Sequence, residues 1–117
     1  MIRSTLLLCL LLLIVPATQA QTPRRFFPQT GYSVSGRFLA YWEANGGLET
    51  FGYPLSAPAR EQNPDDRQWY EVQHFERARF ELHPANQPPF DVLLGRLGVD
   101  RLAARGVRWQ SLPKTRV

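Results

Sequence analysis

Cysteine is nearly absent from this chain of 117 residues. The one cysteine, Cys9, lies inside the apolar run Leu6–Val15, which follows the basic residue Arg3 and precedes the small residues of PATQA. A short apolar run between a basic start and small residues is typical of a secretory signal peptide. Cleavage of residues 1–20 from the 117 leaves 97. We therefore expect a mature chain without cysteine and without disulfide bonds.

A long apolar run is missing as well. The N-terminal run has ten residues, whereas a transmembrane helix needs about 20. The sequence therefore predicts a secreted protein, extracellular or associated with the cell envelope, with no membrane contact after signal cleavage.

The excess of positive over negative charge is also small. Without Arg3, 13 basic residues face 10 acidic ones, and the excess of +3 is spread along the chain. A spread excess of this size favours solvated surface arginines over a binding site for an anionic polymer. We expect no nucleic acid partner.

Histidine is scarce, with only His74 and His83. A catalytic zinc ion usually takes three protein ligands, which these histidines and one of three neighbouring glutamates, Glu71, Glu76 and Glu81, could supply if they converged within about 3 Å of one point. No H-E-x-x-H or similar spacing holds them together. We expect no catalytic residue, no metal and no cofactor, and we keep as an alternative a small secreted hydrolase or metal-dependent enzyme that uses these residues.

Aromatic residues are plentiful, with 7 Phe, 4 Tyr and 3 Trp, all in the mature part. In a small domain without disulfides these rings must form much of the core. Some could instead form a platform on which a sugar ring stacks, with polar neighbours that bind its hydroxyl groups. The core interpretation is favoured for most of the rings. The candidate ligand-binding residues are Trp42, Tyr53, Trp69, Tyr70, Arg79 and His83.

The first half of the mature chain predicts helices between glycines. Residues 21–30 contain two prolines and predict an extended lead-in, with Phe26 and Phe27 able to tuck against the domain. Ser35 is a suitable N-cap for a helix over residues 36–45 that Gly46 ends, and residues 47–51 predict one short helical turn that Gly52 ends. The polar residues 57–68 predict a loop or hairpin tip.

The second half predicts strands. Alternating apolar and polar residues favour strands at Trp69–Phe75 and Arg79–His83, joined by a tight turn near residues 76–78. A short strand, Val92–Leu94, and a helix, Val99–Arg105, ended by Gly106, follow. The predicted fold is therefore a small single α+β domain with one or two short helices packed on a small antiparallel sheet. Its expected layout is a signal peptide at 1–20, a lead-in at 21–30, the domain at 31–106 and a tail at 107–117.

The sequence contains a short internal echo. VSGRF, residues 34–38, and LLGRL, residues 93–97, share the order apolar, any residue, Gly, Arg, apolar, and each enters a predicted helix that ends in glycine. Such an echo is typical of a repeated unit whose second copy begins and is then cut short.

The order GGLETFGYPLS, VQHFERARFELHP and VLLGRLG resembles the LGFP repeat of secreted bacterial cell-envelope proteins, over roughly residues 31–100. Phe51 stands in place of the repeat's leucine and Tyr53 in place of its phenylalanine. Ala78 stands where the strand turn of the family prefers glycine, so that this turn must differ. The resemblance implies a non-catalytic module that is associated with the cell wall or appended to secreted hydrolases. Together with the signal-peptide pattern and the lack of a catalytic constellation, it leads us to expect an LGFP-repeat-like module that binds cell-envelope glycan, either cell-wall polysaccharide or peptidoglycan.

A third interpretation is a protein-interaction module. An unfinished second repeat leaves an apolar face or a strand edge uncovered, which favours self-association.

Overall fold

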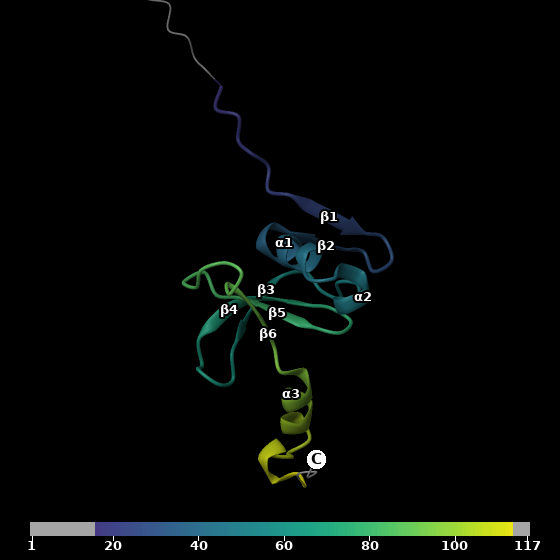
Figure 1. Ribbon diagram of the computed structural model, residues 1–117, viewed down its shortest axis with the longest axis vertical. Coiled ribbons are helices and arrows are strands. Elements are labelled where there is room, and N and C mark those ends of the chain that lie inside the picture. The colour runs from purple at the N-terminus through teal and green to yellow at the C-terminus, as the bar shows by residue number, and fades with distance from the viewer. Residues whose placement is uncertain (1–15, 114–117) are drawn as a thin grey trace, which may run out of the picture.

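Four antiparallel strands form the central sheet of the fold. They are β3 (Ala59–Gln62), β4 (Trp69–His74), β5 (Arg79–Leu82) and β6 (Val92–Leu94), and they lie in this order across the sheet (Figure 1). This computed structural model describes residues 16–113. The apolar run of the predicted signal peptide, Leu6–Val15, and the end of the predicted tail, residues 114–117, lie outside the described residues.

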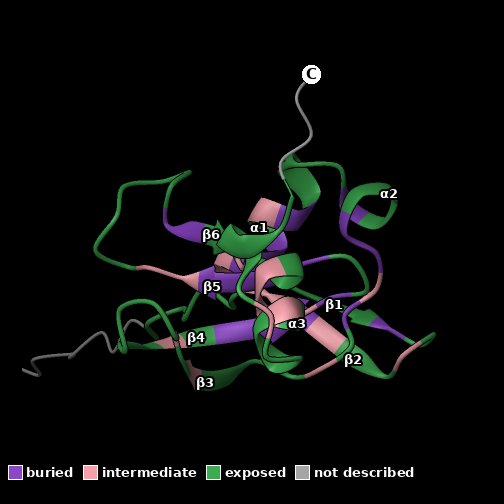
Figure 2. Cartoon of the chain, turned by 90° about the horizontal axis from the view of Figure 1, so that it is seen from below, coloured by how far each residue is buried: buried purple, intermediate pink, exposed green. Residues whose placement is uncertain are grey.

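The alternation of side chains along β4 and β5 gives the sheet two different faces. Gln73 and Phe80 lie opposite each other and point to the inner face, which is covered by helices. Val72 and Glu81 also lie opposite each other and point to the outer face. Figure 2 shows that the middle parts of both strands are buried.

Two helices and a hairpin cover the inner face. α1 (Gly36–Ala44) buries Phe38, Leu39 and Trp42, and α2 (Gly47–Phe51) follows it directly. The hairpin of β1 (Arg24–Phe27) and β2 (Tyr32–Ser35) lies beside α1. The prediction of a small single α+β domain with short helices on an antiparallel sheet is therefore confirmed.

Phe80 lies at the centre of the core. Its side chain is fully buried, and its ring centroid lies between 4.3 and 5.8 Å from those of four other aromatic rings. These rings belong to Phe38, Tyr41, Phe51 and Phe75. Because aromatic rings bury a large area each, this cluster confirms the prediction that they form much of the core.

The glycines end the helices where the sequence predicts. The helix predicted over residues 36–45 and the turn predicted over 47–51 agree with α1 and α2 to within one residue. Gly46 has φ +107° and Gly52 has φ +78°, a region that residues with a side chain rarely adopt. Ser35 occupies the N-cap position of α1, but its side chain makes no capping hydrogen bond, and its backbone belongs to β2.

The segment around α2 fixes the turn between β4 and β5. Glu76 accepts a hydrogen bond from the backbone N–H of Tyr53 at 2.7 Å and donates its own backbone N–H to the Tyr53 carbonyl at 3.0 Å. The guanidinium group of Arg77 donates to three carbonyl groups at distances between 2.5 and 3.3 Å. These carbonyls belong to Leu48, Glu49 and Thr50. They lie in the last turn of α2, where carbonyl groups lack partners further along the helix, although the Leu48 carbonyl also accepts from the backbone N–H of Gly52 at 3.0 Å.

The conformation of the same turn is compatible with alanine at position 78. The backbone N–H of Phe75 donates to the Ala78 carbonyl at 2.7 Å, and no residue of the turn has a positive φ. Ala78 is buried in the core. The turn therefore does not require glycine, and a methyl group fills the space.

An ion pair ties α1 to the start of β6. Nε and Nη2 of Arg37 donate to the two carboxylate oxygens of Asp91 at 2.5 and 2.7 Å. This hydrogen-bonded pair holds the pKa of Asp91 below its usual range and raises the pKa of Arg37.

Two strands lie in segments that the sequence predicts as an extended lead-in and as a loop or hairpin tip. β1 lies inside the predicted lead-in 21–30, and its last residue Phe27 is buried, whereas Phe26 is exposed. β3 occupies part of the predicted loop 57–68. Neither RRFF nor AREQ alternates between apolar and polar residues, so both strands depend on their partners, β2 and β4. The folded part therefore begins before residue 31.

The C-terminal part lies on the other side of the sheet from α1. α3 (Leu97–Ala104) confirms the predicted second helix, although it begins two residues earlier, and the short helix η1 (Trp109–Ser111) follows Gly106 at φ +71°. Neither helix buries a residue. Over the described residues, every helix is too short or too polar to cross a membrane.

Replacement of Gly52 by alanine is expected to destabilise the domain by at least about 2 kcal/mol, because φ +78° and ψ −167° suit glycine alone. The added Cβ would also lie 2.6 Å from Cβ of Glu76, which holds the β4–β5 turn. Urea denaturation measures the change. Gly98→Ala in α3 is the matched control, because a Cβ added at Gly98 would have no neighbouring atom within 4 Å. Equal stability of the two variants would contradict the assigned role of Gly52.

Candidate functional site

The outer face of the sheet carries a chain of charged side chains. Arg79 and Glu81 both point outward from β5 and are more than nine-tenths buried. Nη1 of Arg79 donates to Oε2 of Glu81 at 2.9 Å, and Nε of Arg79 donates to Oε2 of Glu61, on β3, at 3.3 Å. The buried guanidinium group thus joins two carboxylates.

A histidine lies at each end of this chain. Nε2 of His74 lies 2.8 Å from Oε1 of Glu61, and Nε2 of His83 lies 2.5 Å from Oε1 of Glu81. Because a carboxylate only accepts hydrogen bonds, each histidine must donate from Nε2. The outer face therefore holds a continuous hydrogen-bonded row in the order His74, Glu61, Arg79, Glu81, His83.

An aromatic ring extends the row. The ring of Tyr70, on β4, stacks on the imidazole ring of His83, with centroids 3.9 Å apart and planes at 27°. The Tyr70 hydroxyl group donates to Oδ2 of Asp66 at 2.6 Å. This hydrogen bond lowers the pKa of Asp66 and raises the pKa of Tyr70. The ring is thus held at both its face and its hydroxyl group.

The carboxyl group of Glu61 is held in its charged form. Partial burial would raise its pKa, but the hydrogen bonds and charges of His74 and Arg79 outweigh burial, so that the pKa lies below its usual range. Glu61 therefore keeps its negative charge near neutral pH.

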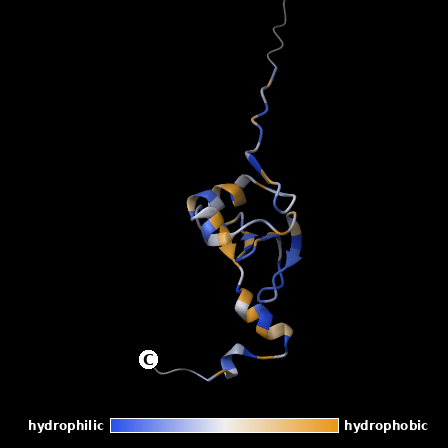
Figure 3. Ribbon diagram, turned by 90° about the vertical axis from the view of Figure 1, so that its right-hand side faces the viewer, coloured by the Kyte–Doolittle hydropathy of each residue, from blue (hydrophilic) through white to orange (hydrophobic). Residues whose placement is uncertain are grey.

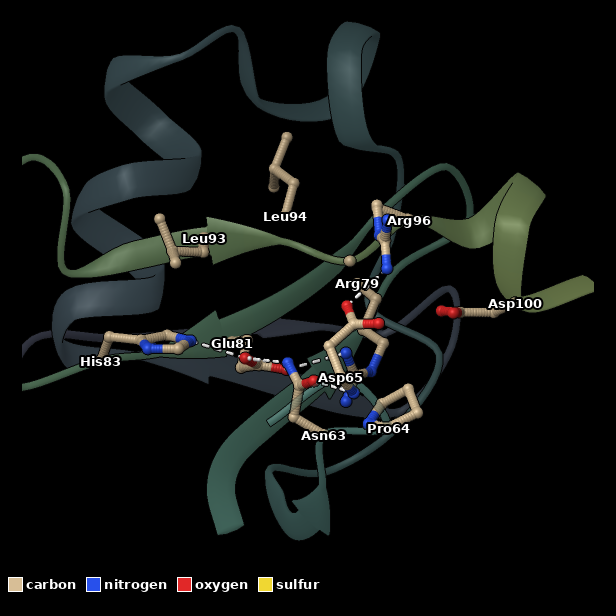
Figure 4. Close-up of a pocket in the computed structure, with 11 residues that line it drawn as sticks. Asn63, Pro64, Asp65, Arg79, Glu81, His83, Leu93, Leu94, Arg96 and Asp100 are labelled. Carbon is tan, nitrogen blue, oxygen red and sulfur yellow. Dashed lines mark hydrogen bonds and ion pairs between the residues drawn. The ribbon is translucent and has the colours of Figure 1, made fainter. Parts of the chain in front are cut away.

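A cleft of about 210 Å³ opens beside Arg79 and Glu81, between the tip of the β3–β4 hairpin and the start of α3 (Figure 4). The amide group of Asn63, at the hairpin tip, donates to Glu81 at 2.9 Å. Nη2 of Arg96, just before α3, donates to Oδ2 of Asp65 at 2.5 Å. The polar side chains that line the cleft are those of Asn63, Asp65, Arg79, Glu81, His83, Arg96 and Asp100.

The backbone of Gly95 passes close to Arg79 beside this cleft. Its backbone N–H donates to the Arg79 carbonyl at 2.8 Å, and a Cβ at this position would lie 3.1 Å from Cδ of Arg79. The glycine of the second echo therefore lets the chain pass close over the buried guanidinium side chain.

The four candidate aromatic residues do not form one platform. Trp42 is buried, and its Nε1 donates to the Gly52 carbonyl at 3.1 Å. Tyr53 is half-buried against the core, with its ring 6.0 Å from that of Phe27. Trp69 and Tyr70 are consecutive in β4, so they point to opposite faces of the sheet.

Three of the six candidates do come together. Tyr70, Arg79 and His83 lie on the outer face, in the row described above. Their signal in the sequence is the period of two along β4 and β5, which places alternate residues on one face.

The geometry does not favour the histidine-based alternative. His74 and His83 share a face, but each binds its own carboxylate, and Arg79 lies between the two. Within residues 16–113, no three side chains of His, Cys, Asp or Glu are grouped closely enough to hold a metal ion. Glu71 points to the inner face, and Glu76 binds the backbone of Tyr53 in the turn.

Five residues of the site were not predicted from the sequence. Three of them, Glu61, Asn63 and Asp65, lie in the segment predicted as a loop or hairpin tip, Arg96 lies between β6 and α3, and Asp100 lies in α3. The first three approach Arg79 and Glu81 because β3 pairs with β4, a pairing that the polar sequence AREQ does not reveal. An excess of charged residues on both sides of a hairpin tip is the one signal that could have suggested them.

Comparisons with known proteins found no match for the chain. No family model, no curated protein and no solved structure matches the chain.

Replacement of Glu81 by glutamine is expected to lower the free energy of unfolding by about 3 kcal/mol, because the buried guanidinium group of Arg79 loses its closest carboxylate. The matched control is Asp65→Asn, which removes a carboxylate from the exposed pair with Arg96 and should cost less than about 1 kcal/mol. Chemical denaturation of both variants measures the difference. Similar losses in the two variants would show that the buried Arg79–Glu81 pair contributes no more to the free energy of unfolding than the exposed pair does.

Proposed function

We propose that this protein is a secreted, non-catalytic module that binds glycan of the cell envelope through the outer face of its sheet. The observation that carries the proposal is the cleft beside the buried Arg79–Glu81 pair, with His83 in its lining and the ring of Tyr70 stacked on His83. Polar groups next to an aromatic ring are the combination that binds sugar hydroxyl groups and a sugar's apolar face.

The rigidity of the row supports a binding role. Glu81 receives hydrogen bonds from Arg79, His83 and Asn63, which come from β5, from the residue directly after β5 and from a hairpin tip. Side chains that are already fixed lose little conformational freedom when a ligand arrives, so less binding free energy is spent on ordering them. A weakly bound polymer chain benefits most from such preorganisation.

The pairing of the titratable groups supports a non-catalytic role. A general base or nucleophile needs a free hydrogen-bonding position toward its substrate. The carboxylate of Glu81 is occupied on both oxygens, and that of Glu61 is occupied by His74 and Arg79. The row is therefore better suited to hold a shape than to transfer a proton.

The sequence motifs support the choice of partner. GGLETFGYPLS and FERARF, which resemble the LGFP repeat, are the two segments that fix each other through Glu76 and Arg77. Together with the signal-peptide pattern of residues 1–20, this resemblance favours cell-wall polysaccharide or peptidoglycan as the partner, outside the cell.

Retention of the mature chain on purified cell wall and on soluble cell-wall polysaccharide tests the proposal. Tyr70→Ala is expected to weaken binding about tenfold, because it removes the ring that stacks on His83, a residue of the cleft. Trp69→Ala is the matched control, since it removes an exposed aromatic ring from the neighbouring position but on the opposite face. Wild-type protein that fails to bind any wall fraction, or equal losses in the two variants, would refute the proposal.

A second candidate function, self-association, is favoured by the free edge of β6. Asp91 and Gly95 form hydrogen bonds to β5, so the backbone groups of Val92 and Leu94 point away from it. The opposite edge, β3, is protected by the polar residues Arg60 and Gln62, whereas Leu93 and Leu94 are exposed on β6. Apolar residues continue into α3, which lies apart from the sheet (Figure 3).

An antiparallel β6 edge can pair with the same edge of a second copy across a twofold axis. Light scattering at increasing protein concentration should then detect a dimer, and Leu94→Lys should shift the midpoint of dimerisation at least tenfold higher because a charged residue at a strand edge opposes pairing. Gln62→Lys on the β3 edge is the control. A monomer at all concentrations would exclude this function and leave glycan binding untouched.

A further inference from the structure

The cleft is more acidic than the chain that carries it. Two arginines, Arg79 and Arg96, and three carboxylates, Asp65, Glu81 and Asp100, line it, whereas the whole chain has a formal net charge of +4. The ligand therefore meets an excess of one negative charge on a positively charged protein. This local sign matters most in a partly enclosed space, where the effective dielectric constant is lower than in water.

Both arginines of the cleft are already occupied by carboxylates of the chain. Arg79 binds Glu81 and Glu61, and Arg96 binds Asp65. An anionic ligand would have to displace one of these partners to form an ion pair. Displacement at Arg79 would leave the buried carboxylate of Glu81 without its cation, which is costly in a site that water barely reaches.

One carboxylate of the cleft has no such partner. Within residues 16–113, Asp100 at the start of α3 makes no side-chain hydrogen bond and no ion pair. Oδ1 of Asp65 is likewise without a hydrogen bond in this part of the chain. These oxygens repel an anion but accept hydrogen bonds from hydroxyl groups.

The two arginines of the cleft also offer hydrogen-bond donors to a ligand. Arg79 uses Nε and Nη1, and Arg96 uses Nη2, so each arginine retains N–H donors. A hydroxyl group both donates and accepts, so it can bind between a carboxylate oxygen and a guanidinium N–H without disturbing their pairing.

The size of the cleft limits how much ligand it holds. Its volume of about 210 Å³ is below the range of roughly 300–1,000 Å³ that encloses drug-sized ligands. The space suits one sugar ring, and a longer chain would continue over the surface beside Tyr70 and His83.

From these charges and contacts we propose that the cleft selects uncharged, hydroxyl-rich sugar units and rejects anionic ones. This inference rests on the proposed glycan-binding function and names the class of sugar that the same site takes. Its consequence is that binding to the wall depends on hydrogen bonds and ring contact and is insensitive to salt, in spite of the basic character of the whole chain.

Affinity of the mature chain for soluble polymers tests the inference. Arabinan and dextran serve as uncharged probes, polygalacturonate as an anionic probe and chitosan as a cationic probe, at about 50 and 500 mM salt. We expect at least one uncharged polymer to bind, with a change of less than about twofold between the two salt concentrations. Polygalacturonate should bind at least about tenfold more weakly.

A charge reversal in the cleft tests whether the carboxylates of the cleft cause the weak binding of the anionic polymer. Asp100→Lys is expected to strengthen polygalacturonate binding about tenfold at low salt, because it removes the unpaired carboxylate and adds a cation. Glu43→Lys makes the same change of charge on the exposed side of α1, across the sheet from the cleft, and should alter binding less than about twofold.

The outcomes separate the two proposals. Failure of every polymer and every wall fraction to bind would refute glycan binding itself. Polygalacturonate or chitosan bound more tightly than both uncharged polymers would overturn the inference while glycan binding stands. Equal gains in the Asp100→Lys and Glu43→Lys variants would also overturn it, since the discrimination would then belong to the net charge of the chain.

Discussion

The alternation of side chains along β5 is the constraint on which the rest of the structure depends. Phe80 points inward and is fully buried at the centre of the aromatic core, while its neighbours Arg79 and Glu81 point outward and form the buried ion pair. Core and candidate site are therefore the two sides of one short strand. A slip of one residue in the register of β5 would bury two charges in the core and expose Phe80.

Most of the inner side of the fold could be predicted from the sequence, because its signals are local. Glycines with positive φ at positions 46 and 52 end α1 and α2, and the alternation in WYEVQHF and RFELH reveals the two central strands. β1 and β3 could not be predicted, because RRFF and AREQ become strands only through pairing with β2 and β4. The residues that β3 brings to the site could not be predicted either, since Glu61 reaches Arg79 and Asn63 reaches Glu81, each across 18 positions of the chain.

The outer face shows how a small domain can keep charges in a position that water barely reaches. The cost of burying the charge of Arg79 is lowered by its hydrogen bonds to Glu61 and Glu81. The cost of burying Glu81 is lowered further by hydrogen bonds from Asn63 and His83. The same hydrogen bonds hold the side chains of Arg79 and Glu81 in one arrangement beside the cleft.

The guanidinium group of Arg77 also links α2 to the β4–β5 turn. α2 has only five residues, far fewer than the roughly 12–15 that an isolated helix needs to persist in water. Its terminal carbonyls are bound by a side chain from the β4–β5 turn, about 28 positions later in the sequence. We therefore expect α2 to depend on the β4–β5 turn, so that opening of this turn would expose the last carbonyl groups of the helix.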